Sequence, residues 1–160
     1  MQVYGRLVTP GEPLQQGALP LPALEGRQVL VRVLASGLCH SDLHLAKGEL
    51  GTPKWGAYTL GHEGAGLVQA LGPECSAGLR VGQLVGVYPW LSGSDGMGKA
   101  LGCGLDGLFA SHVVVPDERL LVAAPEGMSP EELALLACSG VTAYSALTKA
   151  GMPDTLVIIG

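Results

Sequence analysis

Apolar and polar positions alternate along several short stretches of the chain, and these stretches predict β-strands. Residues 28–35 alternate in part and are rich in valine, whose branched side chain suits a strand. Similar patterns predict strands over residues 80–87 and 108–116, with turn residues between them. Residues 60–68 mix glycine with apolar residues, which predicts a strand whose backbone packs closely against a neighbour. The pattern therefore indicates a mainly β structure.

Two helices are predicted late in the chain. The first has Ser129 as its cap, proline at the first helical position and Glu132 at the third, a capping box that precedes a segment ending at Ala137. The second is expected over residues 142–149, with a glycine and a proline directly after it as stop signals. Cys138 is thus predicted to lie at the junction of two helices.

The last segment, residues 155–160, is a short run of β-branched and apolar residues. Such a run is typical of a buried parallel strand that opens a βαβ unit. Gly160 stands where a glycine-rich phosphate loop would begin, but one glycine is no fingerprint. A C-terminal strand of the preceding domain is the alternative.

Composition limits the function. A chain of 160 residues suits one domain, and 25 glycines, 11 prolines and 14% charged residues favour strands and turns. The net charge of −5 gives no reason to expect nucleic acid or a membrane surface as partner. No secretory signal and no membrane-spanning apolar run is present, so we expect a cytoplasmic protein with thiol or metal use of its 4 cysteines.

The cysteines and histidines offer a metal site. Cys39, His62 and Cys138 form a Cys₂His set of the kind that binds catalytic zinc, with the fourth position open to water or substrate. Each of these residues taken alone would more often be an ordinary core residue. Asp42 is expected to orient the ligand imidazole, with a turn-forming aspartate as the alternative.

Five ordered sequence blocks carry a family resemblance. With these blocks the chain resembles the zinc-dependent alcohol dehydrogenases of the medium-chain dehydrogenase/reductase family; they are Gly37–Asp42, Gly61–Gly64, Val81–Gly86, Cys138–Tyr144 and Leu156–Gly160. The resemblance implies a mainly β, α+β fold, with a GroES-like catalytic domain over residues 1–152. It also implies that residues 153–160 are the first strand of a truncated Rossmann α/β domain.

The same resemblance implies an activity. Relatives oxidise an alcohol to an aldehyde or ketone by transferring hydride from a zinc-bound alkoxide to NAD or NADP. Without the rest of the cofactor domain, the fragment itself is expected to be inactive. Residues 90–104 contain one cysteine where many relatives hold a structural zinc with four, so we expect one catalytic zinc and no structural zinc.

Several residue roles follow from the resemblance. Cys39, His62 and Cys138 would be the zinc ligands, and Glu63 would bind the metal transiently. The alternative for Glu63 is a surface glutamate. Ser41 would hydrogen-bond the substrate oxygen, with a helix cap as its alternative.

The remaining roles concern the proton path and the cofactor. His44 would pass the substrate proton to solvent, with a plain surface role as the alternative. His40 would face the cofactor pyrophosphate, Thr142 would pack against the nicotinamide, and Gly160 would begin the phosphate loop. All three cofactor contacts depend on the missing domain.

Five further residues complete the expectations. Trp55 and Trp90 are predicted to line the substrate cleft, with core packing nearly as favoured. We expect Cys75 and Cys103 to be free thiols. His112 is expected at an exposed strand edge.

Other functions compete with the enzyme. A non-catalytic zinc-binding module of the GroES-like fold is one, and a co-chaperonin-like structural barrel is another. Zinc-free quinone reductases are disfavoured, because they lack the ligand set. The predicted partner is a small-molecule alcohol, aldehyde or ketone, with a homo-oligomer left open.

Overall fold

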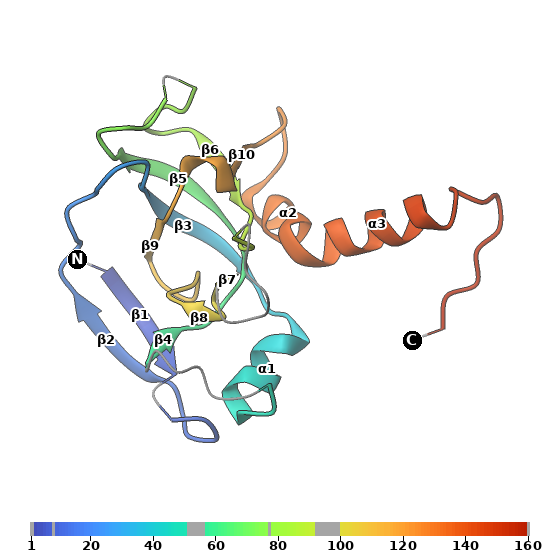
Figure 1. The fold of residues 1–160 in the computed structure, drawn as a ribbon, viewed down its shortest axis with the longest axis horizontal. Coiled ribbons are helices and arrows are strands. Elements are labelled where there is room, and N and C mark those ends of the chain that lie inside the picture. The colour runs from blue at the N-terminus through green and yellow to red at the C-terminus, as the bar shows by residue number, and fades with distance from the viewer. Residues whose placement is uncertain (1, 8, 51–56, 77, 92–99, 160) are drawn as a thin grey trace.

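The main sheet has five antiparallel strands (Figure 1). In spatial order they are β10 (Leu121–Ala123), β6 (Leu84–Val87), β5 (Glu63–Leu71), β3 (Val29–Gly37) and β9 (His112–Val115). The computed structural model describes residues 2–7, 9–50, 57–76, 78–91 and 100–159. The long central pair β3 and β5 carries most of the sheet, and its ends position the site described below.

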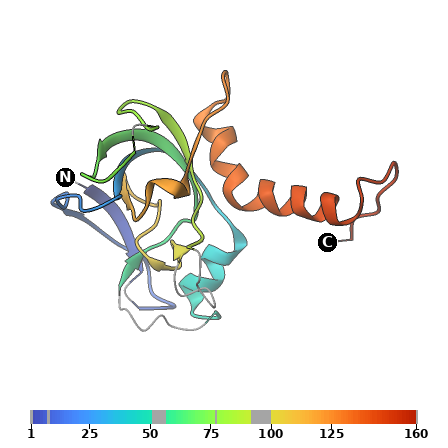
Figure 2. The same ribbon diagram turned by 45° about the horizontal axis from the view of Figure 1, so that its top comes forward.

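Two smaller sheets also lie within the described residues. One is formed by β2 (Gln15–Leu19), β1 (Gln2–Leu7) and β4 (Tyr58–Thr59), and the other by the parallel pair β7 (Ala100–Leu101) and β8 (Gly104–Leu105). A bridge between Tyr4 and Ala110 joins β1 to the segment before β9. The strands curve around a common interior, as Figure 2 shows.

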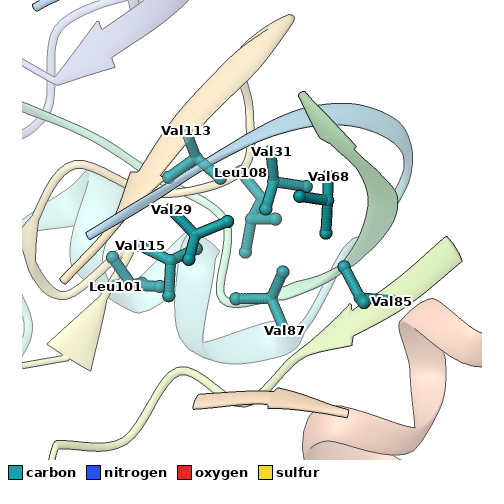
Figure 3. Packing of buried hydrophobic residues seen from close by; sticks show 9 residues of the cluster. All are labelled: Val29, Val31, Val68, Val85, Val87, Leu101, Leu108, Val113 and Val115. Atoms are coloured by element: carbon teal, nitrogen blue, oxygen red, sulfur yellow. The ribbon is translucent and has the colours of Figure 1, made fainter. Parts of the chain in front are cut away.

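Valine and leucine side chains fill this interior (Figure 3). They come from β3, β5, β6, β9 and the segment around β7 and β8: Val29, Val31, Val68, Val85, Val87, Leu101, Leu108, Val113 and Val115. Alternate residues of each strand point to one face, so the period-2 pattern of the sequence delivers these side chains to a single core.

Glycines in β5 allow the strands to approach closely. A Cβ atom at Gly66 would overlap the carbonyl oxygen of Arg32 on β3, and one at Gly64 would overlap the Leu108 side chain. The predicted close packing of residues 60–68 is therefore confirmed, although the strand begins at Glu63.

The described part of the chain also contains three α-helices. They are α1 (His40–Lys47), α2 (Pro130–Leu135) and α3 (Val141–Lys149), and a 3₁₀ turn, η2 (Glu118–Leu120), precedes β10. Helix α2 packs on β3 and β5, where Leu133 and Ala134 contact Ala65. Helix α3 projects away from the strands in both ribbon views and buries none of its residues (Figures 1 and 2).

Most predicted elements are present. The strand over residues 28–35 and the two late helices are confirmed, as is the capping box of Ser129 and Glu132. The strands predicted over 80–87 and 108–116 are shorter, as Leu84–Val87 and His112–Val115. None of the described helices is long and apolar enough to cross a bilayer.

One prediction is wrong. Thr155–Ile159 forms no strand, and Val157, Ile158 and Ile159 are at least 80% exposed. A parallel strand needs neighbours for its backbone hydrogen bonds, and no described strand lies alongside this segment. Gly160 lies outside the described residues.

Candidate metal centre

Strand pairing brings the first ligands together. At the end of the β3–β5 ladder, Gly37 lies opposite Glu63. Cys39 follows β3 by two residues and is the N-cap of α1, whereas His62 directly precedes β5. Two segments distant in sequence therefore meet because their strands are neighbours.

Cys138 comes to the same place from a segment much later in the sequence. It lies in a π-helical turn, η3 (Leu136–Gly140), between α2 and α3. The hydroxyl of Ser139 donates to the Leu135 carbonyl at 3.0 Å, within the same turn. Such π turns occur often at functional sites. The predicted position of Cys138 between two helices is confirmed, and the π turn is an addition.

Four donor atoms converge. One ligand atom from each of Cys39, His62, Glu63 and Cys138 lies within 4.8 Å of the others. His62 and Glu63 are each only 2% exposed, which rules out a surface position for the glutamate. Two thiols, an imidazole and a carboxylate are donors that zinc binds in proteins, so the residues present fit this metal.

Asp42 organises the site. Its Oδ1 lies 3.2 Å from His62 Nδ1, and the same carboxylate accepts hydrogen bonds from the backbone N–H groups of Cys39 and Gly61. A carboxylate only accepts, so Nδ1 of His62 carries the proton and Nε2 is left as a metal donor. The expected contact between Asp42 and the imidazole is present. Its alternative as a turn residue does not hold, because Asp42 is buried within α1.

The pKa values of the Cys39 and Cys138 thiols are shifted in opposite directions. Burial works to raise the pKa of Cys39, but hydrogen bonds with Ser41 and the nearby His62 outweigh it and lower that pKa. Burial, with the negative charges of Cys39 and Glu63, raises the pKa of Cys138 to about 12. Mutual repulsion among the anionic forms is what a bound divalent cation would relieve.

The pKa of His62 is raised. Burial opposes the charged imidazole, but the hydrogen bond and charge of Asp42, with a smaller effect of Cys39, prevail. The ring is therefore a strong base, as a metal-ligating imidazole beside a carboxylate should be.

The predicted proton-path residues lie on α1. Ser41 is half-buried, and its Oγ is 3.7 Å from Cys39 Sγ. His44 is partly exposed and its Nδ1 is bonded to the carboxylate of Glu49. The ring of His40 stacks on that of His44, with centroids 4.7 Å apart. Sequence inspection gave no role to Glu49.

Of the residues predicted to contact the cofactor or to line the cleft, Trp90 lies beside the metal donors. Thr142 is exposed near the start of α3. The Trp90 ring centroid is 6.0 Å from that of His62, so Trp90 borders the donor cluster while also packing against buried residues such as Leu60. Trp55 lies outside the described residues.

The other cysteines and His112 stand apart from the cluster. Cys75 and Cys103 are free, as predicted, and neither belongs to the group of metal donors found among the described residues. His112 lies on the edge strand β9, where its ring is hydrogen-bonded to Ser111 and Gln69.

The sequence and the fold resemble those of known proteins. Residues 25–126 match the alcohol dehydrogenase GroES-like domain. The chain belongs to the alcohol dehydrogenase family of the medium-chain dehydrogenase/reductase type. The predicted GroES-like fold is thereby confirmed.

Individual relatives agree with this membership. An NAD-dependent alcohol dehydrogenase of Sulfurisphaera tokodaii is 37% identical, the match covering 97% of this chain and 50% of the relative. A protein of the same name from Saccharolobus solfataricus is 35% identical with the same coverage. The chain thus spans about half the length of the curated relatives it matches.

Solved structures give the same result. The alcohol dehydrogenase of Aeropyrum pernix has a TM-score of 0.79 and 32% identity, covering 94% of this chain and 48% of that one. A putative alcohol dehydrogenase of Sinorhizobium meliloti has a TM-score of 0.81 and 26% identity, covering 94% and 47%.

Helix α1 was not predicted, although the sequence contains signals that indicate it. Asp42 stands three residues after the cap Cys39, and Gly48 follows a last turn that contains His44 and Lys47. An acidic first turn, a basic last turn and a glycine at the end are the ordinary marks of a short helix.

Proposed function

We propose that this chain is the metal-holding catalytic domain of a zinc-dependent alcohol dehydrogenase. The protein would oxidise a small-molecule alcohol to an aldehyde or ketone, with NAD or NADP accepting the hydride. The proposal rests on the convergence of two thiols, an imidazole and a carboxylate within 4.8 Å. Two relatives named NAD-dependent alcohol dehydrogenase support this class of reaction.

Cys39, His62 and Cys138 would hold the zinc, with Glu63 as a nearby fourth donor. When bound, zinc would supply a Lewis acid that lowers the pKa of the substrate hydroxyl, and the nicotinamide would accept the hydride. Asp42 keeps the His62 ring in the tautomer that leaves Nε2 free.

The chain would also conduct the hydroxyl proton. The Ser41 hydroxyl both accepts and donates, so it can take the proton while passing on its own. Ser41 lies beside Cys39 at the start of α1, and His44 lies one turn later with its side chain 42% exposed. An imidazole suits the exit because its ordinary pKa is near neutral pH.

Cofactor contacts would come from the exposed side of the site. His40 and Thr142 are both exposed, on α1 and α3 respectively. His40 would face the cofactor pyrophosphate and Thr142 the nicotinamide, in company with a nicotinamide-binding half. We expect the 160 residues alone to show no turnover for want of that half.

Trp90 would set the width of the substrate cleft. Its ring borders the donor cluster through His62 and offers a flat apolar wall. A Trp90→Ala variant should improve kcat/KM for bulky alcohols relative to small ones. Equal effects on both would argue for a packing role alone.

One observation favours a second function. Glu63 is close enough to the other donors to close a four-ligand site, as in a structural zinc centre. A non-catalytic zinc-binding module is therefore the alternative.

Metal analysis of the chain separates the two. We expect about one zinc per chain after purification. After exchange for cobalt, the absorption bands should shift on addition of imidazole, because an open position accepts an outside ligand. If imidazole leaves the cobalt bands of the parent unchanged but shifts those of Glu63→Gln, the result would support the closed four-ligand site. A chain that binds no zinc would refute both functions.

Turnover should be measured on a protein that also carries a nicotinamide-binding half. That protein should reduce NAD or NADP in the presence of an alcohol and lose this activity when zinc is chelated. Activity that persists without zinc would contradict the proposed reaction.

A further inference from the structure

The chain folds back on itself directly after α1. Gly48 ends the helix in the left-handed conformation, with φ of 76°. The next residue, Glu49, donates its backbone N–H to the carbonyl oxygen of His44 at 2.9 Å. The side chain of Glu49 returns to the same residue, because its carboxylate is bonded to His44 Nδ1. Backbone and side chain thus both attach Glu49 to His44.

Two further contacts fix this pair. Lys47 Nζ lies 3.9 Å from the other carboxylate oxygen of Glu49. The ring of His40 stacks on that of His44 with an interplanar angle of 23°. The Glu49 carboxylate therefore has the Lys47 cation on one side and the His44 imidazole on the other. Stacking on His40 restricts the orientation of the His44 ring.

The bond to Glu49 determines which nitrogen of His44 can accept a proton. A neutral imidazole has one N–H and one acceptor nitrogen, and an ionised carboxylate can only accept. Nδ1 must therefore carry the hydrogen, and Nε2 is left as the acceptor. Without a partner at Nδ1, both tautomers would be populated and only part of the protein would present a basic Nε2.

We propose that Glu49 is the positioning residue of the proton path: it holds His44 in the Nδ1–H tautomer, so that Nε2 receives the proton that leaves the substrate. This inference deepens the proposed function and rests on it. Each turnover adds one proton to Nε2, which makes His44 an imidazolium beside the Glu49 carboxylate. Loss of one proton from Nε2 to water restores the neutral ring, and Glu49 stays ionised throughout.

The surroundings suit that role. The side chains of His44 and Glu49 are 42% and 48% exposed, so water reaches the pair. Chiefly the hydrogen bond from His44, and then the positive charges of Lys47, His44 and His40, lower the pKa of Glu49. These are the titratable groups of the described chain that act on the carboxylate, and all of them lie on α1.

Nitrogen NMR of the imidazole rings tests the tautomer in the 160-residue chain. The parent should show His44 mainly as Nδ1–H. In Glu49→Gln the excess of the Nδ1–H tautomer should be smaller, because a neutral amide oxygen accepts a weaker hydrogen bond than a carboxylate. In Glu49→Leu, which has no acceptor, the tautomers should be mixed. Glu126→Gln, which removes an exposed carboxylate from the turn before α2, is the matched control and should leave the tautomer populations unchanged.

A rate measurement in the complete enzyme tests the consequence. Glu49→Gln should lower kcat roughly threefold to tenfold, because a neutral amide holds the Nδ1–H of His44 less firmly than a carboxylate and fewer molecules then present an acceptor Nε2. In a His44→Ala background the same change should have no further effect, because Glu49 acts through His44.

The outcomes are distinguishable. An Nε2–H tautomer in the parent, or parental tautomer populations in Glu49→Leu, would overturn the role of Glu49 whether or not the enzyme is active. An effect of Glu49→Gln on kcat that persists in the His44→Ala background would also overturn it. A parent with zinc and cofactor but no hydride transfer would instead refute the proposed function, and the NMR result would still decide the tautomer.

Discussion

Asp42 Oδ1 lies 3.2 Å from His62 Nδ1, and both side chains are almost completely buried. This pair links α1 to the start of β5, so the helix capped by Cys39 is attached to the strand that begins with Glu63. The same carboxylate binds the backbone of Cys39 and Gly61. A single residue thus holds two metal donors in register.

Replacement of Asp42 by asparagine should weaken zinc binding. Asparagine keeps an acceptor oxygen but loses the charge that supports the His62 imidazole. Zinc affinity should fall by roughly 10- to 100-fold, as for other partners of metal-bound histidines. Competition with a coloured chelator measures the affinity. An Asp42→Asn chain with parental affinity would show that Asp42 serves the fold alone.

Loss of either thiol should abolish stoichiometric zinc. Cys39→Ser and Cys138→Ser each remove one donor from the cluster. Cys75→Ser is a matched control, because this thiol donates to the carbonyl of Gln28 and lies outside the donor cluster. Elemental analysis of the chelator-washed chains should give zinc in the control and none in the two ligand variants. Full zinc in both ligand variants would refute the assignment.

Replacement of Gly66 by alanine should destabilise the sheet. The new Cβ would overlap the backbone carbonyl of Arg32, and a backbone atom cannot move aside as a side-chain tip can. We expect a loss of about 1–3 kcal/mol in the free energy of unfolding, measured with urea. Gly78→Ala is the control, because its Cβ would meet only Ser76 Oγ at an ordinary 3.5 Å. A parental midpoint for Gly66→Ala would contradict the close approach of β3 and β5.

The cap of α2 should contribute to stability. Ser129 Oγ accepts from the Glu132 N–H at 3.2 Å, and the Glu132 carboxylate accepts from the Ser129 N–H at 2.9 Å. Ser129→Ala should cost about 1 kcal/mol. Threonine at the same position should restore most of the loss, and a failure to do so would point away from capping. Chemical denaturation of the three chains gives the comparison.

Asp117 should make stability fall in acid. Hydrogen bonds from the side chain and backbone of Arg119, with the charges of Arg119 and Arg27, lower the pKa of Asp117 to about 2. Because the pKa of Asp117 is lowered in the folded protein, the ionised side chain stabilises the fold fully above the ordinary carboxyl pKa of 3.8. This stabilisation is lost as the pH falls through about 2. The pair is exposed enough that the effect should stay below about 1 kcal/mol. Asp117→Asn should therefore be slightly less stable than the parent at pH 6 and equal to it at pH 2. A stability difference between Asp117→Asn and the parent that grew in acid would have the opposite pH dependence and would contradict this prediction.

Sequence patterns located most of the architecture because its causes are local. Alternation in residues 28–35 predicted β3, and the capping box at Ser129 predicted α2. By contrast, residues 155–159 have a strand-like composition but form none, because a strand depends on a neighbour that its own residues do not supply.

The sequence by itself determined the donor types, their order and the family blocks in which they lie, since these are properties of residue identity and spacing. Only the tertiary structure placed Cys138 beside Cys39 and His62, buried Glu63 next to them, and joined Glu49 to His44. Those contacts depend on strand pairing between β3 and β5, on the packing of α2 against both, and on the chain reversal at Gly48. Each is a relation between segments, which residue identity alone does not specify.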